Sequence, residues 1–442
     1  MSGFKVGFSD IIITPKLHLP MGGYGARLCN ATGVHDDLFA RAVYFNYNNG
    51  ESLIIAADIL SFPLKAIKYY RKLINHQIGI EEQRIFICAL HNHSGPDTMG
   101  LIHPLRGFFR SSLDVRYFLK LGKKFVKLAE NAKMSSQEAL VDAEKRVMEK
   151  RLIINRREPL RDSKYDVGVI RFDDLQGNII GFIINYACHG TVLPSDNTLY
   201  TAEYPGYLIK RIKARLGKKI HVIYLNGPCG DLNPNLFDFN VSLAEVDAKK
   251  EILYDGPGHA KGNFKRAREI GFAIADKALD ISEEMKCIPI TDFNHTFKSY
   301  FLSRKYLLYE KTVKMHLRHL NFKFKVGRFK LFWCIKKPPI PYPIDFIRKD
   351  GKYLQEAEIH VLKLNDIAIV GIPGEVFSEL GNRILAKSKV KKTIIAELAN
   401  GSIGYLYPLE DYKKGGYEMF LSLDVTGGTY LTNKAIKLLN SM

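Results

Sequence analysis

The stretch that best indicates the fold is residues 84–96, which read Arg-Ile-Phe-Ile-Cys-Ala-Leu-His-Asn-His-Ser-Gly-Pro. Its first half is a short apolar run typical of a buried strand, and its second half holds two histidines and a turn. In α/β proteins, ligands bind just beyond the carboxyl ends of strands. His91 and His93 share one side of an extended chain, so one or both can reach a metal ion. The simpler alternative is a strand that ends in a polar loop.

Other apolar runs end in polar residues in the same way. They lead into His189 after residues 179–187, into Asp231 and Asn233 after 220–225, and into Glu375 after 367–370. Helical spacing between these runs predicts an α/β fold with a mixed, largely parallel sheet or sheets flanked by helices. Two histidines and a glutamate are one set of ligands that zinc accepts, so a zinc site is predicted at the strand carboxyl ends. No internal repeat is visible, and residues 135–150 are predicted to be helical.

Composition narrows the class of protein. The 442 residues are 46% hydrophobic and 25% charged, which is typical of a soluble globular protein. The six cysteines include no Cys-x-x-Cys pair, which favours a reducing compartment over a disulfide framework. The first residues lack the pattern of a secretory signal, and no apolar run is long enough to span a membrane. These features predict a cytoplasmic protein without a transmembrane helix.

The net charge of +19 calls for a partner or a solvated surface. Residues 300–337 interleave lysines and arginines with aromatic residues. One interpretation is peripheral contact with an anionic membrane, where rings enter the acyl boundary and cations meet the headgroups. Single-stranded nucleic acid is a less favoured partner, and an ordinary packed segment with solvated charges is the alternative that needs no partner.

The order of motifs along the chain resembles that of the neutral/alkaline non-lysosomal ceramidase family. The motifs are His91-Asn92-His93-Ser94-Gly95-Pro96, Asn155-Arg156, Tyr186-Ala187-Cys188-His189-Gly190-Thr191, Gly230-Asp231-Leu232-Asn233-Pro234-Asn235, Pro373-Gly374-Glu375 and Gly404-Tyr405. Because the resemblance covers almost the whole chain, residues 1–442 are predicted to form a single ceramidase-like catalytic domain, with 300–337 as a basic insertion.

The resemblance also implies the site. It assigns one zinc ion per chain, with four ligands: His91, His189, Glu375 and Tyr405. Beside the metal it places further catalytic residues: His93, Arg156, Asp231, Asn233 and Tyr417. The predicted activity is that of a zinc-dependent amidohydrolase on linear amides, in which metal-bound water attacks an N-acyl bond. His93 or Asp231 would protonate the leaving nitrogen, and Arg156 with Asn233 would stabilise the oxyanion.

The chain departs from the family in three ways, one of which is the missing pattern of a secretory signal, because many relatives are secreted or surface enzymes. Asn233 stands where the family motif has a serine, so a covalent acyl-serine route is closed and attack by metal-bound water is favoured. The chain also stops without the immunoglobulin-like C-terminal domain of full-length ceramidases. The predicted substrate is therefore an N-acylated lipid. The alternatives are an esterase or deacylase acting on a smaller polar acyl compound, and a catalytically inactive lipid-binding relative.

Overall fold

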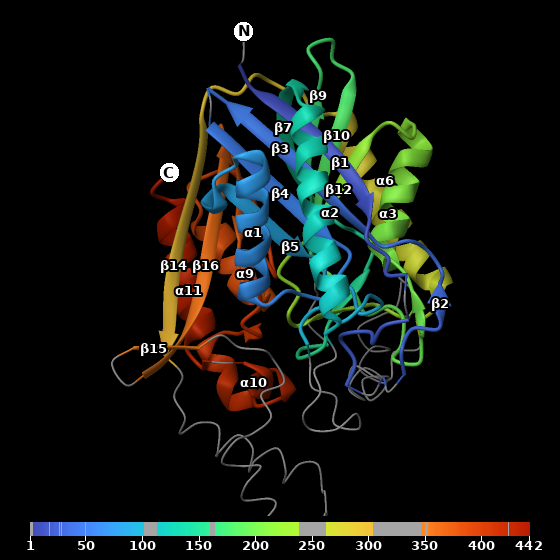
Figure 1. Cartoon of the computed structure of the whole chain (residues 1–442), viewed down its shortest axis with the longest axis vertical. Coiled ribbons are helices and arrows are strands. Elements are labelled where there is room, and N and C mark those ends of the chain that lie inside the picture. The colour runs from blue at the N-terminus through green and yellow to red at the C-terminus, as the bar shows by residue number, and fades with distance from the viewer. Residues whose placement is uncertain are drawn as a thin grey trace, which may run out of the picture.

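The structure, a computed structural model, describes residues 3–16, 18–25, 27, 29–48, 50–100, 113–159, 164–237, 262–303, 346–349, 352–422 and 424–442. Its described residues form three main mixed sheets with helices packed on them (Figure 1). Most of the segment predicted to contact membranes, residues 304–337, lies outside the described residues, so that prediction stays untested. No helix in the described ranges combines the length and apolarity that crossing a membrane requires.

The first sheet has the order β5-β4-β3-β1-β6. Its strands are β1 (Lys5–Ile12), β3 (Phe39–Tyr47), β4 (Gly50–Ala57), β5 (Ile85–Ala89) and β6 (Gln137–Glu138), and its helices are α1 (Leu64–Ile78) and α2 (Val115–Met134). Figure 1 shows α1 and α2 side by side over one face of this sheet. Helix α2 begins at Asp114, whose side chain accepts a 2.7 Å hydrogen bond from the Tyr117 amide, and α1 ends at Gly79 with a φ of 82°.

The second sheet has the order β12-β10-β9-β7. Its strands are β7 (Leu140–Val147), β9 (Asp166–Asp173), β10 (Ile179–Tyr186) and β12 (His221–Asn226), and its helices are α3 (Glu203–Leu216) and α6 (Phe264–Glu283). The third sheet has the order β14-β16-β17-β19, with β15 paired to β16. Its strands are β14 (Phe293–Ser303), β15 (Phe346–Lys349), β16 (Lys352–Leu364), β17 (Ile367–Gly371) and β19 (Lys392–Ala396), and its helices are α9 (Ser378–Lys387) and α11 (Gly427–Leu439).

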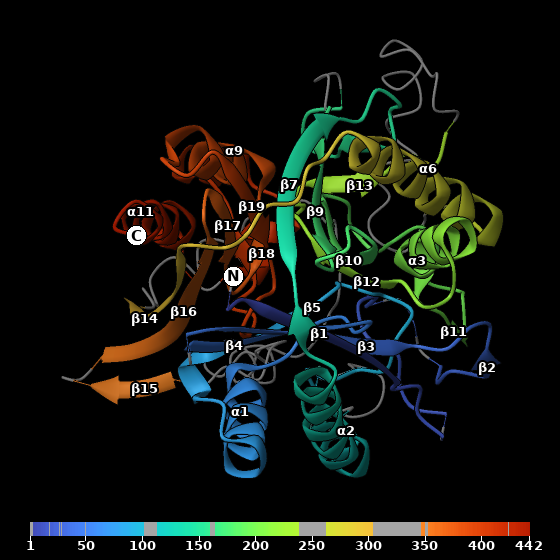
Figure 2. The same cartoon turned by 90° about the horizontal axis from the view of Figure 1, so that it is seen from above.

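The three sheets repeat one topology. In each, a first strand pairs antiparallel with a second, the second forms a hairpin with a third, and the third pairs parallel with a fourth. One helix joins the third and fourth strands, and another follows the fourth. Figure 2 shows the three resulting helix pairs, α1/α2, α3/α6 and α9/α11, around the outside of the molecule with the sheets between them. The chain therefore contains a structural repeat that its sequence does not reveal.

The sheets share one apolar core. A single cluster of buried residues draws Phe45 and Phe86 from the first sheet, Val169 and Ile183 from the second, and Ile369 from the third. Separate clusters lie between the first sheet and α1/α2, and between the third sheet and α9/α11. The first and third sheets thus have one face toward the common core and another toward their helices, while in the second repeat the common core extends to α3 and α6.

Two predictions about the elements are wrong. The sheets are not largely parallel, because each has a single parallel pair beside antiparallel ones. The hairpin turns near Asn48, 174–178 and Asn365 produce this pattern, since a short turn can connect only antiparallel strands. Residues 137–147 form β6 and β7 rather than a helix. In β7 the buried Val141 and Ala143 alternate with more exposed residues, which is the period of a strand.

The parallel pairs fix where chemistry can occur. Their carboxyl ends lead into His91 after β5, His189 after β10, Asp231 after β12 and Glu375 after β17. Short ladders tie these loops together. They pair β8 (Ile153–Asn155) with β13 (Leu232–Pro234), and β18 (Glu375–Val376) with β20 (Tyr405–Leu406). Other small elements of the described chain are β2 (Gly33–Val34), β11 (Leu199–Tyr200) and α10 (Tyr417–Leu421).

Candidate metal centre

The loop after β5 turns sharply at His91. Its φ of 56° is a left-handed conformation that residues with a Cβ seldom adopt. The turn is held by hydrogen bonds from the Asn92 side chain to the carbonyls of Asp58 and Thr201, at 3.1 and 2.8 Å. The loop after β10 runs beside it, and a Cβ on Gly190 would lie 2.4 Å from the His91 carbonyl oxygen. Only glycine at position 190 therefore lets His189 approach His91 this closely.

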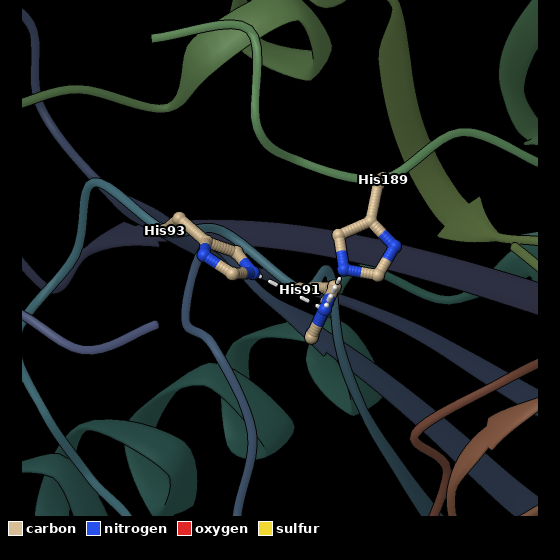
Figure 3. A group of neighbouring side chains, drawn as sticks. All are labelled: His91, His93 and His189. Carbon is tan, nitrogen blue, oxygen red and sulfur yellow. Dashed lines mark hydrogen bonds between the residues drawn. The ribbon is translucent and has the colours of Figure 1, made fainter. Parts of the chain in front are cut away.

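Three buried imidazoles meet at this point. The Nε2 atom of His91 lies 2.7 Å from Nε2 of His189 and 3.2 Å from Nε2 of His93. Figure 3 shows the three rings with these nitrogens directed toward one another. Among the described residues, His91, His93 and His189 form a group whose ligand atoms lie close enough together to bind one metal ion.

The Nδ1 atoms, which point away from the cluster, show which imidazoles are held in place by hydrogen bonds. Nδ1 of His91 lies 3.3 Å from the Leu60 carbonyl oxygen, and Nδ1 of His189 lies 3.1 Å from that of Cys229. An Nδ1–H that donates to a carbonyl sets the tautomer whose Nε2 carries the lone pair, as in many metal-binding histidines. The backbone therefore holds these two imidazoles with Nε2 directed into the cluster.

Glu375 brings a carboxylate to the same point from the third sheet. Its Oε2 atom lies 3.3 Å from Nε2 of His91 and 3.7 Å from Nε2 of His189. This oxygen is buried and accepts no hydrogen bond of good geometry from any described residue. A buried carboxylate oxygen without a donor is costly, so a cation at the point of convergence would satisfy it. His91, His189 and Glu375 come from the first, second and third repeats respectively.

The electrostatics of the group agree with its shape. Burial opposes a charge on His91, but the neighbouring Glu375 carboxylate outweighs it and raises the pKa of His91. Burial, followed by the effect of His91, lowers the pKa of both His93 and His189 well below the usual value. The lowered pKa values favour neutral rings on His93 and His189. Imidazole nitrogens together with a carboxylate oxygen are donors that fit zinc or a similar divalent ion.

His93 differs from the other two histidines. Its Nδ1 atom is buried and has no hydrogen-bond partner among the described residues. Tyr24 packs edge-on against its ring with centroids 4.8 Å apart, and a Cβ on Gly23 would lie 2.3 Å from Nδ1. The imidazole is therefore held by packing, while its backbone is held by Arg27, which donates to the His93 carbonyl oxygen at 2.6 Å.

Arg156 follows β8 and is buried beside the cluster. Its Nε donates to Glu418 at 2.9 Å and its Nη1 to Oδ1 of Asn233 at 3.0 Å, and Nη2 donates to the Gly230 carbonyl oxygen. Arg156 is also one of the charges that lower the pKa of His189, after burial and His91. The guanidinium is thus a fixed cation close to the imidazoles.

Asp231 and Asn233 occupy different positions in the loop after β12. The carboxylate of Asp231 is buried and accepts bonds from the Asn155 amide at 2.7 Å and from Ser378 N and Oγ at 2.7 and 2.9 Å. It therefore joins β8, β13 and the start of α9, and both of its oxygens are engaged. Asn233 is only partly buried, and no hydrogen bond from its Nδ2 to another described residue is present.

The two predicted tyrosines lie next to Arg156. Tyr405 stands opposite Glu375 in the parallel β18–β20 ladder, and the Arg156 guanidinium carbon lies 5.7 Å from its ring centroid. Tyr417 packs edge-on against Tyr405 with centroids 5.8 Å apart and lies 5.3 Å from the same guanidinium carbon. Burial raises the pKa of Tyr417 to about 12, so its hydroxyl stays protonated at neutral pH. The metal-ligand role of Tyr405 remains a prediction.

Sequence reasoning missed two buried glutamates. Glu418 pairs with both Arg156 and Arg157, at 2.9 and 3.1 Å. Glu397, at the carboxyl end of β19, accepts hydrogen bonds from the loop that holds His189 and from Val376, next to Glu375. The one available signal for Glu397 was its place after the apolar run at 393–396, the same position that singled out His91 and Glu375.

The chain resembles known proteins in sequence and in fold. No protein-family model matches the chain. The neutral ceramidase of Drosophila melanogaster is 23% identical over 313 residues, which cover 64% of this chain and 44% of that protein. The neutral ceramidase of Drosophila pseudoobscura pseudoobscura is 22% identical over 313 residues, with the same two shares covered. These matches therefore span less than half the length of the curated relatives.

Solved structures match over the whole chain. The crystal structure of neutral ceramidase from Pseudomonas aeruginosa superposes with a TM-score of 0.75 at 16% identity, covering 100% of this chain and 74% of that one. A structure described as ceramidase complexed with C2 gives a TM-score of 0.76 at 16% identity, covering 100% of this chain and 75% of that one.

Fold and site together define a mixed α/β protein with a buried histidine cluster at the carboxyl ends of its parallel strand pairs. The sequence matches relate this class of protein to one group of enzymes. In sequence and in fold, the chain is similar to the neutral ceramidases.

Proposed function

We propose that the chain is a zinc-dependent hydrolase that cleaves the amide bond of an N-acylated lipid such as ceramide. The observation that carries the proposal is the convergence of three imidazole Nε2 atoms and the unsatisfied Glu375 Oε2 on one point. The family supplies the class of substrate, because the relatives are neutral ceramidases and one solved relative is described as complexed with C2.

His91, His189 and Glu375 would hold the metal, with Tyr405 as the proposed fourth ligand and one ion per chain. Zinc bound there would supply Lewis acidity and would lower the pKa of a coordinated water to about 7. His93 is the alternative third protein ligand, since its Nε2 also lies in the cluster. We favour Glu375 because it has a buried oxygen with no other partner and because the outer nitrogen of His93 is not anchored.

His93 is then free to move a proton. Its Nε2 lies 3.2 Å from that of His91, and its low pKa keeps the ring neutral, so it can accept a proton and pass it on to the leaving nitrogen. An amine leaves an amide readily only when it is protonated. We give this role to His93 rather than to Asp231, whose carboxylate is engaged by Asn155 and Ser378.

Arg156 and Asn233 would stabilise the charge that develops on the substrate carbonyl oxygen. Arg156 is fixed by Glu418 and Gly230, so its charge is in place before the reaction. Asn233 holds Nη1 of Arg156 through Oδ1, which leaves its Nδ2 as a donor. Tyr417, protonated beside Arg156, is a further donor at the same side of the site.

A substrate panel tests this proposal. The zinc-loaded protein is incubated with ceramides of several acyl lengths, other N-acyl lipids and small acyl esters, and the released fatty acid and amine are quantified. Hydrolysis of ceramide or another N-acyl lipid at the highest kcat/KM is expected. A higher kcat/KM for small esters would show that the substrate is a smaller acyl compound and not an N-acyl lipid. Lipid binding without any released product would show that the protein is a lipid-binding relative without catalytic activity.

A further inference from the structure

The segment immediately after β19 lies behind the metal cluster and contacts the loops of all three repeats. The Leu398 carbonyl accepts a hydrogen bond from Ala89 in the first sheet at 3.2 Å, and the Leu398 amide donates to Gly374 of the third at 3.2 Å. The Glu397 amide donates to the Asn226 carbonyl of the second sheet at 3.0 Å. Leu398 and Asn400 have φ values of 48° and 62°, so the segment is strained where it makes these contacts.

Glu397 is completely buried within this segment, and its carboxylate accepts four hydrogen bonds. Oε2 accepts from the backbone amides of Cys229 and Val376, each at 3.1 Å. Oε1 accepts from the Cys229 thiol at 2.9 Å and from the Asn226 amide at 3.3 Å. Burial raises the pKa of Glu397 to about 7, while His91 and the Cys229 donors favour the ionised carboxylate. A divalent cation in the cluster would favour the ionised form further.

These bonds reach two of the metal-ligand candidates through one residue each. Cys229 is the residue whose carbonyl holds Nδ1 of His189, and Val376 directly follows Glu375. Oε2 of Glu397 therefore links the Cys229 segment, whose carbonyl contacts His189, to the β18 strand that carries Glu375. Its charge also acts on the cluster, since Glu397 raises the pKa of His91 after the larger effects of burial and Glu375.

We propose that Glu397 is a positioning residue of the metal centre, which holds the His189 and Glu375 ligands in register and supplies a second negative charge toward the dication. The inference rests on the proposed metal site. A divalent ion bound by two neutral imidazoles and one carboxylate keeps a net charge of about +1 in a buried site. A second buried carboxylate nearby offsets this remaining positive charge. If the cluster were only a packed group of histidines, the charge of Glu397 would have no cation to stabilise.

The test measures zinc affinity, not activity, in the full chain. Competition with a chromogenic chelator gives the zinc dissociation constant of the wild type and of E397Q. Glutamine can keep an oxygen toward Cys229 N and Val376 N but removes the charge, so we expect zinc binding about 10- to 100-fold weaker, as for other partners of metal ligands. Wild-type affinity in folded E397Q would overturn the proposal.

A matched control separates positioning from general stability. Glu358 is equally buried, lies on β16 and pairs with Arg71 at 2.5 Å, away from the cluster. E358Q is expected to lower stability yet bind zinc as the wild type does; an equal loss of affinity in E358Q would contradict a specific role for Glu397. Should E397Q fail to fold, E397D keeps the charge but cannot span both amides, and unchanged affinity there would also refute the proposal. Absence of zinc binding in the wild type would instead refute the proposed function.

Discussion

The described part of the chain contains two histidine clusters with opposite hydrogen-bond patterns. In the second, Arg71 donates to His360 at 3.2 Å, His360 and His295 share a 3.2 Å contact, and His295 lies 2.8 Å from the Ser52 hydroxyl. Every ring nitrogen there has its own partner in a linear chain between the first and third sheets. In the cluster of His91, His93 and His189, the nitrogens instead meet at one point beside an unsatisfied carboxylate.

This difference shows how a structural histidine is distinguished from a candidate ligand. Both clusters contain buried histidines whose pKa lies well below the usual value. Burial and a shifted pKa are therefore not enough to identify a metal site. The feature that identifies a candidate metal site is a group of nitrogen and oxygen lone pairs that point at one another without hydrogen-bond donors between them.

Removing one imidazole from each cluster should have the most unequal effect. H91A is expected to lose zinc and to reduce kcat/KM by at least about a thousandfold, which corresponds to about 4 kcal/mol of transition-state stabilisation. H360A should keep one zinc per chain, because His360 faces Arg71 and not the metal cluster. Metal content by mass spectrometry and steady-state kinetics provide the measurements. Full activity in a zinc-free H91A protein would show that the His91 cluster is not a catalytic metal site.

Breaking the ion pair of the second cluster should affect stability alone. R71M leaves Glu358 buried without its partner and His360 without its donor, so the free energy of unfolding should fall by about 3–5 kcal/mol. Chemical denaturation of the metal-free protein measures this loss, and zinc titration of the folded variant should give wild-type stoichiometry. Loss of zinc without loss of stability would show that Arg71 belongs to the metal centre.

Acid should destabilise the fold through the second cluster. Burial, Arg84 and Arg71 lower the pKa of His295 to about 3, and burial, Arg71 and His295 lower the pKa of His360. Each ring stays neutral in the fold while the unfolded chain takes up a proton below about pH 6.5. The stabilisation is complete above that pH and falls as pH drops toward the folded pKa.

At pH 5, compared with pH 7.5, each such histidine should lower the free energy of unfolding by about 2 kcal/mol. Denaturation of the metal-free wild type and of H360Q at several pH values checks the expectation. H360Q removes one of these groups and leaves His295, His93 and His189, so it should reduce the slope between pH 7.5 and pH 5 in part. An unchanged slope would mean that His360 does not carry this dependence.

The smallest effect is expected at Asn233. N233A removes the acceptor of one Arg156 bond but leaves those to Glu418 and Gly230. We expect kcat to fall about tenfold, or about 1.4 kcal/mol, with zinc content and stability unchanged. N382A, on α9, serves as a surface control. Loss of zinc in N233A would give Asn233 a role in building the metal site.

The sequence predicted the strand ends but not how the sheets are built. Apolar runs followed by His91, His189 and Glu375 were visible because a buried strand and a polar loop differ sharply in composition. The threefold repeat was invisible, because the repeats share topology while their core positions are filled by different apolar residues. The proportion of parallel strand pairs in the sheets was overestimated, because local sequence patterns do not show which strands pair.

The site itself was predictable only in part. Periodicity and composition could not separate His93 from His91, since both lie in one motif and differ only in what surrounds Nδ1. Nor could they find Glu397 and Glu418, whose importance depends on partners 168 and 262 residues away in the chain. The predicted proton-transfer role of Asp231 rested on its residue type, and its bonds to Ser378 and Asn155 appear only in the folded chain.

The most direct test of the metal centre is removal and return of zinc in the wild-type protein. Zinc content and ceramide hydrolysis are measured together after chelation, dialysis and stepwise addition of zinc. One zinc per chain is expected, with hydrolysis lost on chelation and restored in proportion to zinc up to that stoichiometry. Full hydrolysis by the zinc-free protein, or no zinc bound at saturation, would contradict the account.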